Sequence, residues 1–171
     1  MATKNATRNR ATEPTPTAAK RPLVPDYGTD FYGWALQQAN LLQEGRLSEI
    51  DTINVAEELI DLGNEQYDKL ESALAVLFMH LLKWDYQPEK RARSWENTVR
   101  EQRRRVERLL RKNPSLRPRT DEAVAESYQD GRDRASSETD IAVDRFPPEC
   151  PYGWDEIMMR PIRYDPPVRS R

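Results

Sequence analysis

The fold is decided by the stretch His80–Pro88, which reads HLLKWDYQP, and by the RARSW of Arg91–Trp95 that follows it. Together they indicate a helix, a proline corner and a second helix, because proline either ends a helix or occupies the first turn of the next one. Before Trp84, apolar residues recur in alternating steps of three and four, which is typical of one long helix with a buried seam. The seam residues are Ala56, Leu59, Gly63, Tyr67, Leu70, Leu74, Leu77, Leu81 and Trp84.

A helix with this much apolar surface has to be covered on more than one side, so we expect it to run through the middle of a helical bundle. Asp51 is the expected N-cap of this helix. Gly63 lies within the seam, which is typical of a kink or of a close approach between two helices.

Further helices are predicted on both sides of the long one. One begins after Asp30, a typical N-cap, and ends at Gly45, a typical residue after a helix C-terminus. Another covers residues 91–112, and a fourth starts near residue 121 with Thr120 as its N-cap and ends near residue 140.

A short last helix is predicted around Trp154, and no stretch shows the sustained alternation of a β-strand. The sequence therefore predicts an all-α fold. We expect a single helical bundle of about four main helices with a short C-terminal helix, and we place this domain at residues 26–159.

The two ends of the chain differ from this domain in charge. Residues 1–25 contain five basic residues and one acid, and residues 160–171 contain four basic residues and one acid. Because the whole chain has a net charge of −2, the part between the ends is acidic. Both ends are rich in proline and poor in apolar anchors, so we predict two disordered basic tails, at residues 1–25 and 160–171.

The single cysteine, Cys150, excludes a disulfide scaffold and favours a reducing compartment. No apolar run approaches the length of a membrane span, and the N-terminus has no apolar signal-peptide region. We therefore expect a cytoplasmic protein without membrane contact.

Several short stretches, taken in chain order, resemble one protein family. They are DFYGW (Asp30–Trp34), AEELIDLG (Ala56–Gly63), HLLKWDYQP (His80–Pro88), RSW (Arg93–Trp95), REQR (Arg100–Arg103) and FPPECP (Phe146–Pro151). The chain from about residue 27 to residue 158 resembles the bacterial domain of unknown function 29 (DUF29) family. The resemblance implies an all-helical fold, and it brings no reaction, ligand or site residue with it.

His80 and Glu57 are the candidates for catalysis. An imidazole titrates near neutrality and suits a general base, whereas a histidine at a helix–helix boundary often does no more than donate to a carbonyl or a carboxylate. With one histidine, one cysteine and no Glu-x-x-His motif, the sequence offers no standard zinc or carboxylate-bridged metal site. No metal and no cofactor is expected.

The helix predicted at residues 91–112 is rich in arginine, and it is the candidate surface for nucleic acid or for a protein partner. Its candidate residues are Arg91, Arg93, Arg100, Arg104, Arg108 and Arg111. The alternative is that these arginines pair with acids, either one helical turn away, as in Glu96–Arg100, or within the acidic stretch 121–144.

Two glutamines interrupt apolar stripes and need buried hydrogen-bond partners. We predict an interior polar network of Gln38, Glu57, His80 and Gln102.

Three functions remain open at this point. The residues favour a non-enzymatic helical module that binds an unknown protein partner or forms a homo-oligomer. The first alternative is a nucleic-acid-associated protein that uses the basic helix and the tails. The second alternative is a hydrolytic enzyme centred on His80, although the lack of a catalytic constellation argues against an enzyme.

Overall fold

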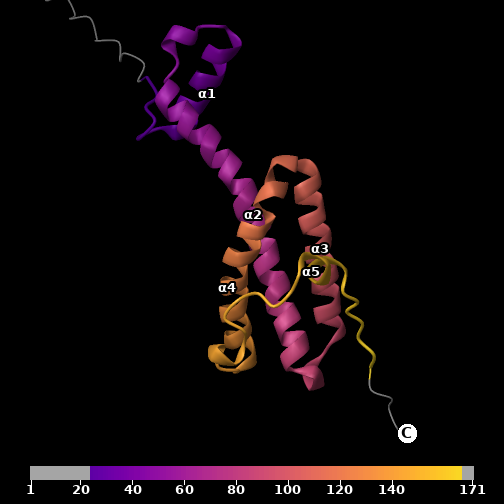
Figure 1. Cartoon of the computed structure of the whole chain (residues 1–171). Helices are drawn as coiled ribbons and strands as arrows, with labels where there is room; N and C mark the ends of the chain where they lie inside the picture. The colour runs from indigo at the N-terminus through magenta and orange to yellow at the C-terminus, as the bar shows by residue number, and fades with distance from the viewer. Residues whose placement is uncertain (1–23, 167–171) are drawn as a thin grey trace, which may run out of the picture. The chain divides into compact units, whose positions relative to one another are not determined.

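A computed structural model describes residues 24–166 of the chain, and within them it shows an all-α protein without a β-strand (Figure 1). This confirms the predicted fold class of four main helices and a short C-terminal helix. The helices are α1 (Phe31–Gln43), α2 (Thr52–Tyr86), α3 (Arg93–Lys112), α4 (Thr120–Thr139) and α5 (Trp154–Met159). Short 3₁₀ helices lie at Leu47–Glu49, Pro88–Lys90, Pro114–Arg119 and Val143–Arg145. None of the helices between residues 24 and 166 is long and apolar enough to cross a membrane.

The chain divides into two compact units, one ending at Val55 and one beginning at Ala56. The division falls inside α2, near its N-terminus. Most of the predicted N-terminal tail lies outside the described residues, as do residues 167–171 of the predicted C-terminal tail.

The first unit is built around α1. Asp30 caps the helix by accepting a hydrogen bond from the Gly33 N–H, which confirms the predicted N-cap. Trp34 donates from its indole nitrogen to Asp51 at 3.2 Å, and the Asp51 carboxylate also accepts the Asn54 N–H and so caps α2. The core of this unit is small, and several large apolar side chains stay exposed: Phe31, Tyr32, Leu36, Leu42, Leu47 and Ile53.

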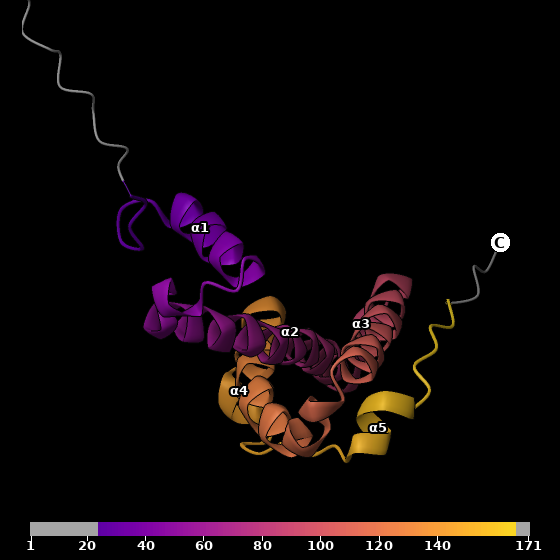
Figure 2. The same ribbon diagram turned by 90° about the horizontal axis from the view of Figure 1, so that it is seen from above.

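The second unit packs α3 and α4 against the C-terminal two-thirds of α2, and α5 lies beside α3 (Figure 2). Its core consists of the predicted seam from Tyr67 onward, joined by residues of the other helices. The fully buried members are Leu70, Leu74, Leu77, Phe78, Leu81, Leu82, Val99, Val106, Tyr128, Phe146 and Ile157.

The first third of the predicted seam is not buried. Leu59 and Ile60 are each 63% exposed, whereas Leu70 and Leu74, on the same face of α2, are completely buried. The expectation that α2 is covered along its whole seam is therefore wrong before Tyr67, because the covering helices of the second unit pack against its later turns.

Two helices, α2 and α4, approach each other closely at Gly131, and not at Gly63 as the sequence predicted. A Cβ atom added at Gly131 of α4 would lie 2.7 Å from the Ala75 carbonyl oxygen and 2.7 Å from the Phe78 Cβ, whereas one added at Gly63 would meet nothing within 4 Å. The absent side chain of Gly131 therefore lets α4 touch α2. Thr120 is also not the N-cap of α4: it is the first helical residue, and its hydroxyl donates to the Arg117 carbonyl.

The packed chain continues beyond α5. Arg160 forms an ion pair with Asp85 at 2.9 Å, Ile162 is buried, and the Tyr164 N–H donates to Glu96. Residues 160–164 are therefore held against α2 and α3 by specific contacts.

Candidate functional site

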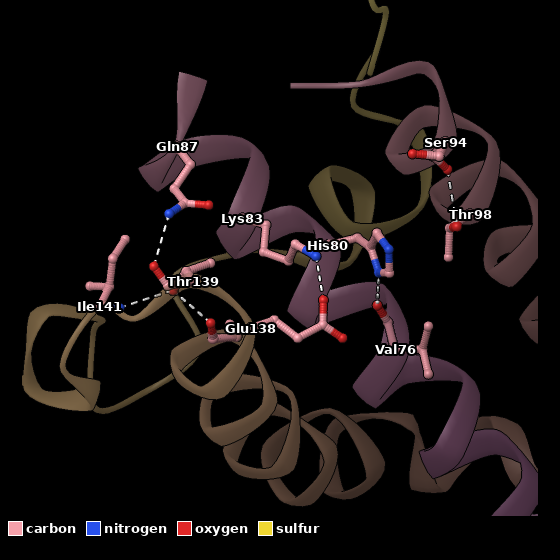
Figure 3. A network of polar contacts seen from close by, with 10 residues as sticks. Val76, His80, Lys83, Gln87, Ser94, Thr98, Glu138, Thr139 and Ile141 are labelled. Atoms are coloured by element: carbon pink, nitrogen blue, oxygen red, sulfur yellow. Dashed lines mark hydrogen bonds and ion pairs between the residues drawn. The ribbon is translucent and has the colours of Figure 1, made fainter. Parts of the chain in front are cut away.

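Three buried polar side chains lie on one side of the chain at the C-terminal end of α2: His80 and Lys83 within the helix, and Gln87 directly after it (Figure 3). Their spacing of three and four residues aligns them along the helix. Gln87 donates to the Thr139 carbonyl at 3.0 Å at the end of α4. Each of these polar groups has a partner, as burial of a polar group requires.

Lys83 is the cation of this cluster, and only 7% of its surface is exposed. Its ammonium forms an ion pair with Glu138 of α4 and lies 4.6 Å from the centre of the Trp95 ring. The lysine therefore connects α2 with both α4 and α3 through a charge pair and a cation–π contact.

His80 is 9% exposed, and its Nδ1 lies 2.9 Å from the Val76 carbonyl oxygen. Because a carbonyl oxygen accepts only, Nδ1 carries the proton and donates it one turn back along α2. Burial lowers the pKa of His80, and the nearby Lys83 ammonium lowers it further. The imidazole is therefore neutral at physiological pH, with a hydrogen bond typical of a structural histidine.

The structure does not bring Glu57 to His80. Both lie on α2, 23 positions apart, which corresponds to about 35 Å along a helix axis. Glu57 is exposed. A catalytic pair of these two residues is excluded by the helix itself, because a general base and its partner need hydrogen-bond contact.

The predicted interior network is also not formed as a unit. Gln38 accepts the Asp51 N–H at 2.8 Å, His80 donates to Val76, and Glu57 is exposed. The Oε1 atom of Gln102 is buried and has no hydrogen-bond partner among the described residues. Gln38 and His80 are both buried and hydrogen-bonded, but to separate backbone groups: Gln38 to the Asp51 N–H, thirteen residues on, and His80 to the Val76 carbonyl, one helical turn back.

The six candidate arginines fall into two groups. Arg91 donates to the Trp84 carbonyl at 2.9 Å and stacks its guanidinium 4.9 Å from the Trp84 ring centre, so it caps the C-terminus of α2. The other five are exposed on α3: Arg93, Arg100, Arg104, Arg108 and Arg111. Their positions fall within one side of the helix, and we call them the α3 arginine row.

The α3 arginine row has no ion pair within residues 24–166. The predicted pairing with acids one turn away, such as Glu96 with Arg100, is not formed. The acids of α4 bind other cations: Glu122 pairs with Arg119, Asp130 with Arg134 and Glu138 with Lys83. The positive charge of the row is therefore left for solvent or for a ligand.

A groove runs beside this row, between α3 and the segment formed by α5 and residues 161–163. It consists of two adjoining hollows of about 510 and 420 Å³, which share Glu107, Met158 and Met159. The first hollow is lined by Arg100, Arg103, Arg104 and Arg163, and the second by Arg111, Arg117 and Trp154.

Two features of this groove were not predicted from the sequence. Trp154 is 36% exposed, whereas Trp84 and Trp95, which flank the proline corner, are buried and half-buried in the bundle. Arg163 comes from the segment that we predicted to be a loose tail. A signal existed in Trp154, which begins a six-residue helix that is too short to bury every side chain.

Within the described residues, no group of three or more His, Cys, Asp or Glu side chains is arranged to hold a metal ion.

Comparison with known proteins gives one match. A family model described as domain of unknown function DUF29 matches residues 27–161. No curated protein and no solved structure matches the chain.

Proposed function

The chain belongs to the DUF29 family, and we propose that it acts as a protein-interaction module that binds its partner through the N-terminal part of α2. The binding surface consists of Ala56, Leu59, Ile60 and Gly63, which we call the α2 apolar row. The observation that carries the proposal is the exposure of 63% each for Leu59 and Ile60.

The α2 apolar row continues the face of α2 that forms the core of the second unit. Tyr67, Leu70 and Leu74 lie on the same side of the helix, and all three are buried. Covering the side chains of Leu59 and Ile60 would gain about 1.5–3 kcal/mol for each, which is enough to select a partner with a matching apolar face. Gly63 adds to the fit, because the space beside its Cα is open.

Charge favours a particular kind of partner. Residues 52–68 contain five acids and neither lysine nor arginine. All four of the exposed acids Glu57, Asp61, Glu65 and Asp68 lie on other sides of α2 than the apolar row, and Glu57 is the one nearest to it, beside Ile60. We therefore propose that the partner presents an amphipathic helix whose apolar face is flanked by lysine or arginine, a helix-in-groove type of recognition with a charged border.

Self-association is the other form of this function. In an antiparallel pair of copies the acidic borders of the two rows would face each other, and this repulsion favours a different partner. A hydrolytic function receives no support from the contacts of His80, whose Nδ1 donates to a backbone carbonyl.

The test uses a synthetic peptide, because the natural partner has no known sequence. A labelled amphipathic helix with a leucine stripe and a lysine border is titrated with the full chain, and binding is followed by fluorescence anisotropy. We expect saturable binding that is weakened at least tenfold by Ile60→Asp. This substitution removes apolar contact, and its new negative charge does not repel the lysine border of the peptide, so a loss of binding reports the apolar contact.

Two controls separate apolar contact from charge. Glu57→Gln, which removes the acid beside Ile60, should weaken binding of the lysine peptide and should improve binding of a matched peptide with a glutamate border. Light scattering on the same samples detects dimers. Binding that is unaffected by Ile60→Asp, or a wild-type dimer that this variant dissolves, contradicts the proposed partner.

A further inference from the structure

We propose that the groove between α3 and α5 binds single-stranded nucleic acid, with the α3 arginine row contacting phosphates and Trp154 stacking on a base. This surface shares no residue with the α2 apolar row, and the inference does not depend on the protein-interaction proposal.

The first support is the availability of the charges. Arginines held in ion pairs gain less from a phosphate than free ones, because a pair must first be broken. The row has no ion pair in the described part of the chain. The two hollows are lined by five arginines besides Arg103, and by three acids, namely Glu96, Glu107 and Asp155. Glu96 in addition accepts the Tyr164 N–H, so its carboxylate is already engaged.

The second support is the shape of the row. From Arg93 to Arg111 the helix advances 18 positions, or about 27 Å. Successive arginines at spacings of three to seven residues are separated by about 5–10 Å along this line. A row of that length offers several cationic contacts to consecutive phosphates of an extended strand.

The third support is the aromatic residue at the end of the row. Trp154 lines the same hollow as Arg111 and Arg117, and it is the most exposed tryptophan of the described chain at 36%. Stacking of bases on aromatic side chains beside a basic groove is the usual way in which proteins bind single strands without reading sequence. Arginines alone would equally suit any polyanion, so Trp154 is what points to nucleic acid.

The groove wall favours a single strand over a duplex. Met158, Met159 and Pro161 provide apolar surface on which an unpaired base or a sugar can lie. A duplex keeps its bases stacked inside and offers only its phosphates to such a wall.

Arg103 is not part of the ligand-binding set. It donates to three backbone carbonyls at the end of α5, those of Glu156, Ile157 and Arg160. It therefore fixes the second wall of the groove against α3.

The experiment titrates a fluorescein-labelled 12-nucleotide oligo-uridine, an oligo-thymidine of equal length and a matched duplex with the full chain at several salt concentrations. Three variants are compared with the wild type: Arg100→Gln/Arg104→Gln in the row, Trp154→Ala, and Trp154→Phe. The control is Lys90→Gln/Arg145→Gln, which removes two exposed charges outside the groove.

We expect single strands to bind more tightly than the duplex. The row variant should lower the slope of log affinity against log salt by about 1.4, because two phosphate contacts are lost. Trp154→Ala should weaken binding about 5- to 150-fold through loss of stacking, and Trp154→Phe should restore most of it. The control double variant should keep the wild-type slope.

The proposal is overturned if the duplex binds as well as the single strands, or if the row variant and the control lose affinity equally. It is also overturned if Trp154→Ala binds like wild type. Circular dichroism on every variant confirms that the helices are retained.

Discussion

The Arg103 guanidinium of α3 donates a 2.7 Å hydrogen bond to the Ile157 carbonyl of α5, and two further bonds from the same side chain reach Glu156 and Arg160. The last carbonyls of a helix have no partner within the helix, and a cation there also interacts favourably with the helix dipole. Burial, together with the neighbouring Arg160, lowers the pKa of Arg103, but a guanidinium stays charged at any physiological pH. Arg103 thus ties the C-terminal end of α5 to α3, in addition to the burial of Ile157 in the core.

We predict that Arg103→Lys loosens this attachment, because an ammonium cannot replace a planar fork that serves three carbonyls. The expected loss is about 1–3 kcal/mol of unfolding free energy, together with faster proteolytic cleavage in residues 150–166. Urea unfolding and limited proteolysis measure both quantities. Arg104→Lys, next in the chain but exposed, is the matched control and should change neither. Equal resistance to proteolysis in the two variants would show that α5 is held by its apolar contacts instead.

A second prediction concerns the contact of α4 with α2. Gly131→Ala should destabilise the protein by about 1–3 kcal/mol, because the new Cβ would lie 2.7 Å from the Ala75 carbonyl oxygen. Gly63→Ala is the matched control inside another helix, where the space is open, and it should stabilise by about 0.5–1 kcal/mol. Thermal unfolding measures the stability of both variants. A Gly131→Ala protein as stable as the wild type would mean that α4 can move away from α2 at no cost in free energy.

The third prediction concerns the buried lysine. Glu138→Ala leaves the Lys83 ammonium without its carboxylate, so it should destabilise by about 1–3 kcal/mol. Lys83→Met keeps the length of the side chain and removes the buried charge, so it should cost less, and the double variant should resemble Lys83→Met alone. A double-mutant cycle by urea unfolding tests this, and additive effects of the two changes would contradict a direct pair.

The fourth prediction follows from the lowered pKa of His80. The unfolded chain binds a proton near pH 6.5, whereas the folded imidazole stays neutral to lower pH. The unfolded state then binds more protons, so wild-type stability falls as the pH drops below 6.5, by at most about 1.4 kcal/mol per pH unit. His80→Gln should lack this component. The check is the difference in unfolding free energy between the two proteins from pH 7.5 to 5, and a constant difference contradicts the burial of a neutral histidine.

The helices were predictable because their periodicity and caps are local. Asp30 at the start of α1 and the proline at position 88 act through their own backbone neighbours, and the structure agrees with both. Gly131 was not predictable in this way, since a glycine reveals nothing about which backbone approaches it. Periodicity also showed that Leu59 lies on an apolar face without showing whether anything covers that face.

The candidate site was less predictable than the fold. The six candidate arginines look equivalent in the sequence, but Arg91 caps α2 whereas Arg104 is exposed on α3. The carbonyls that Arg91 and Arg103 bind belong to other helices, and only tertiary packing identifies them. For the same reason Trp154 could not be told apart from the core tryptophans, because its exposure depends on how α5 lies against α3.

The claim that α2 carries the partner-binding surface is tested most directly by nuclear magnetic resonance. Amide chemical shifts of the ¹⁵N-labelled full chain are recorded during titration with the lysine-bordered leucine peptide. We predict that the largest shifts occur between Ala56 and Gly63 and disappear in Ile60→Asp. Shifts centred on the acids of α4, with residues 56–63 unchanged, would contradict the proposal.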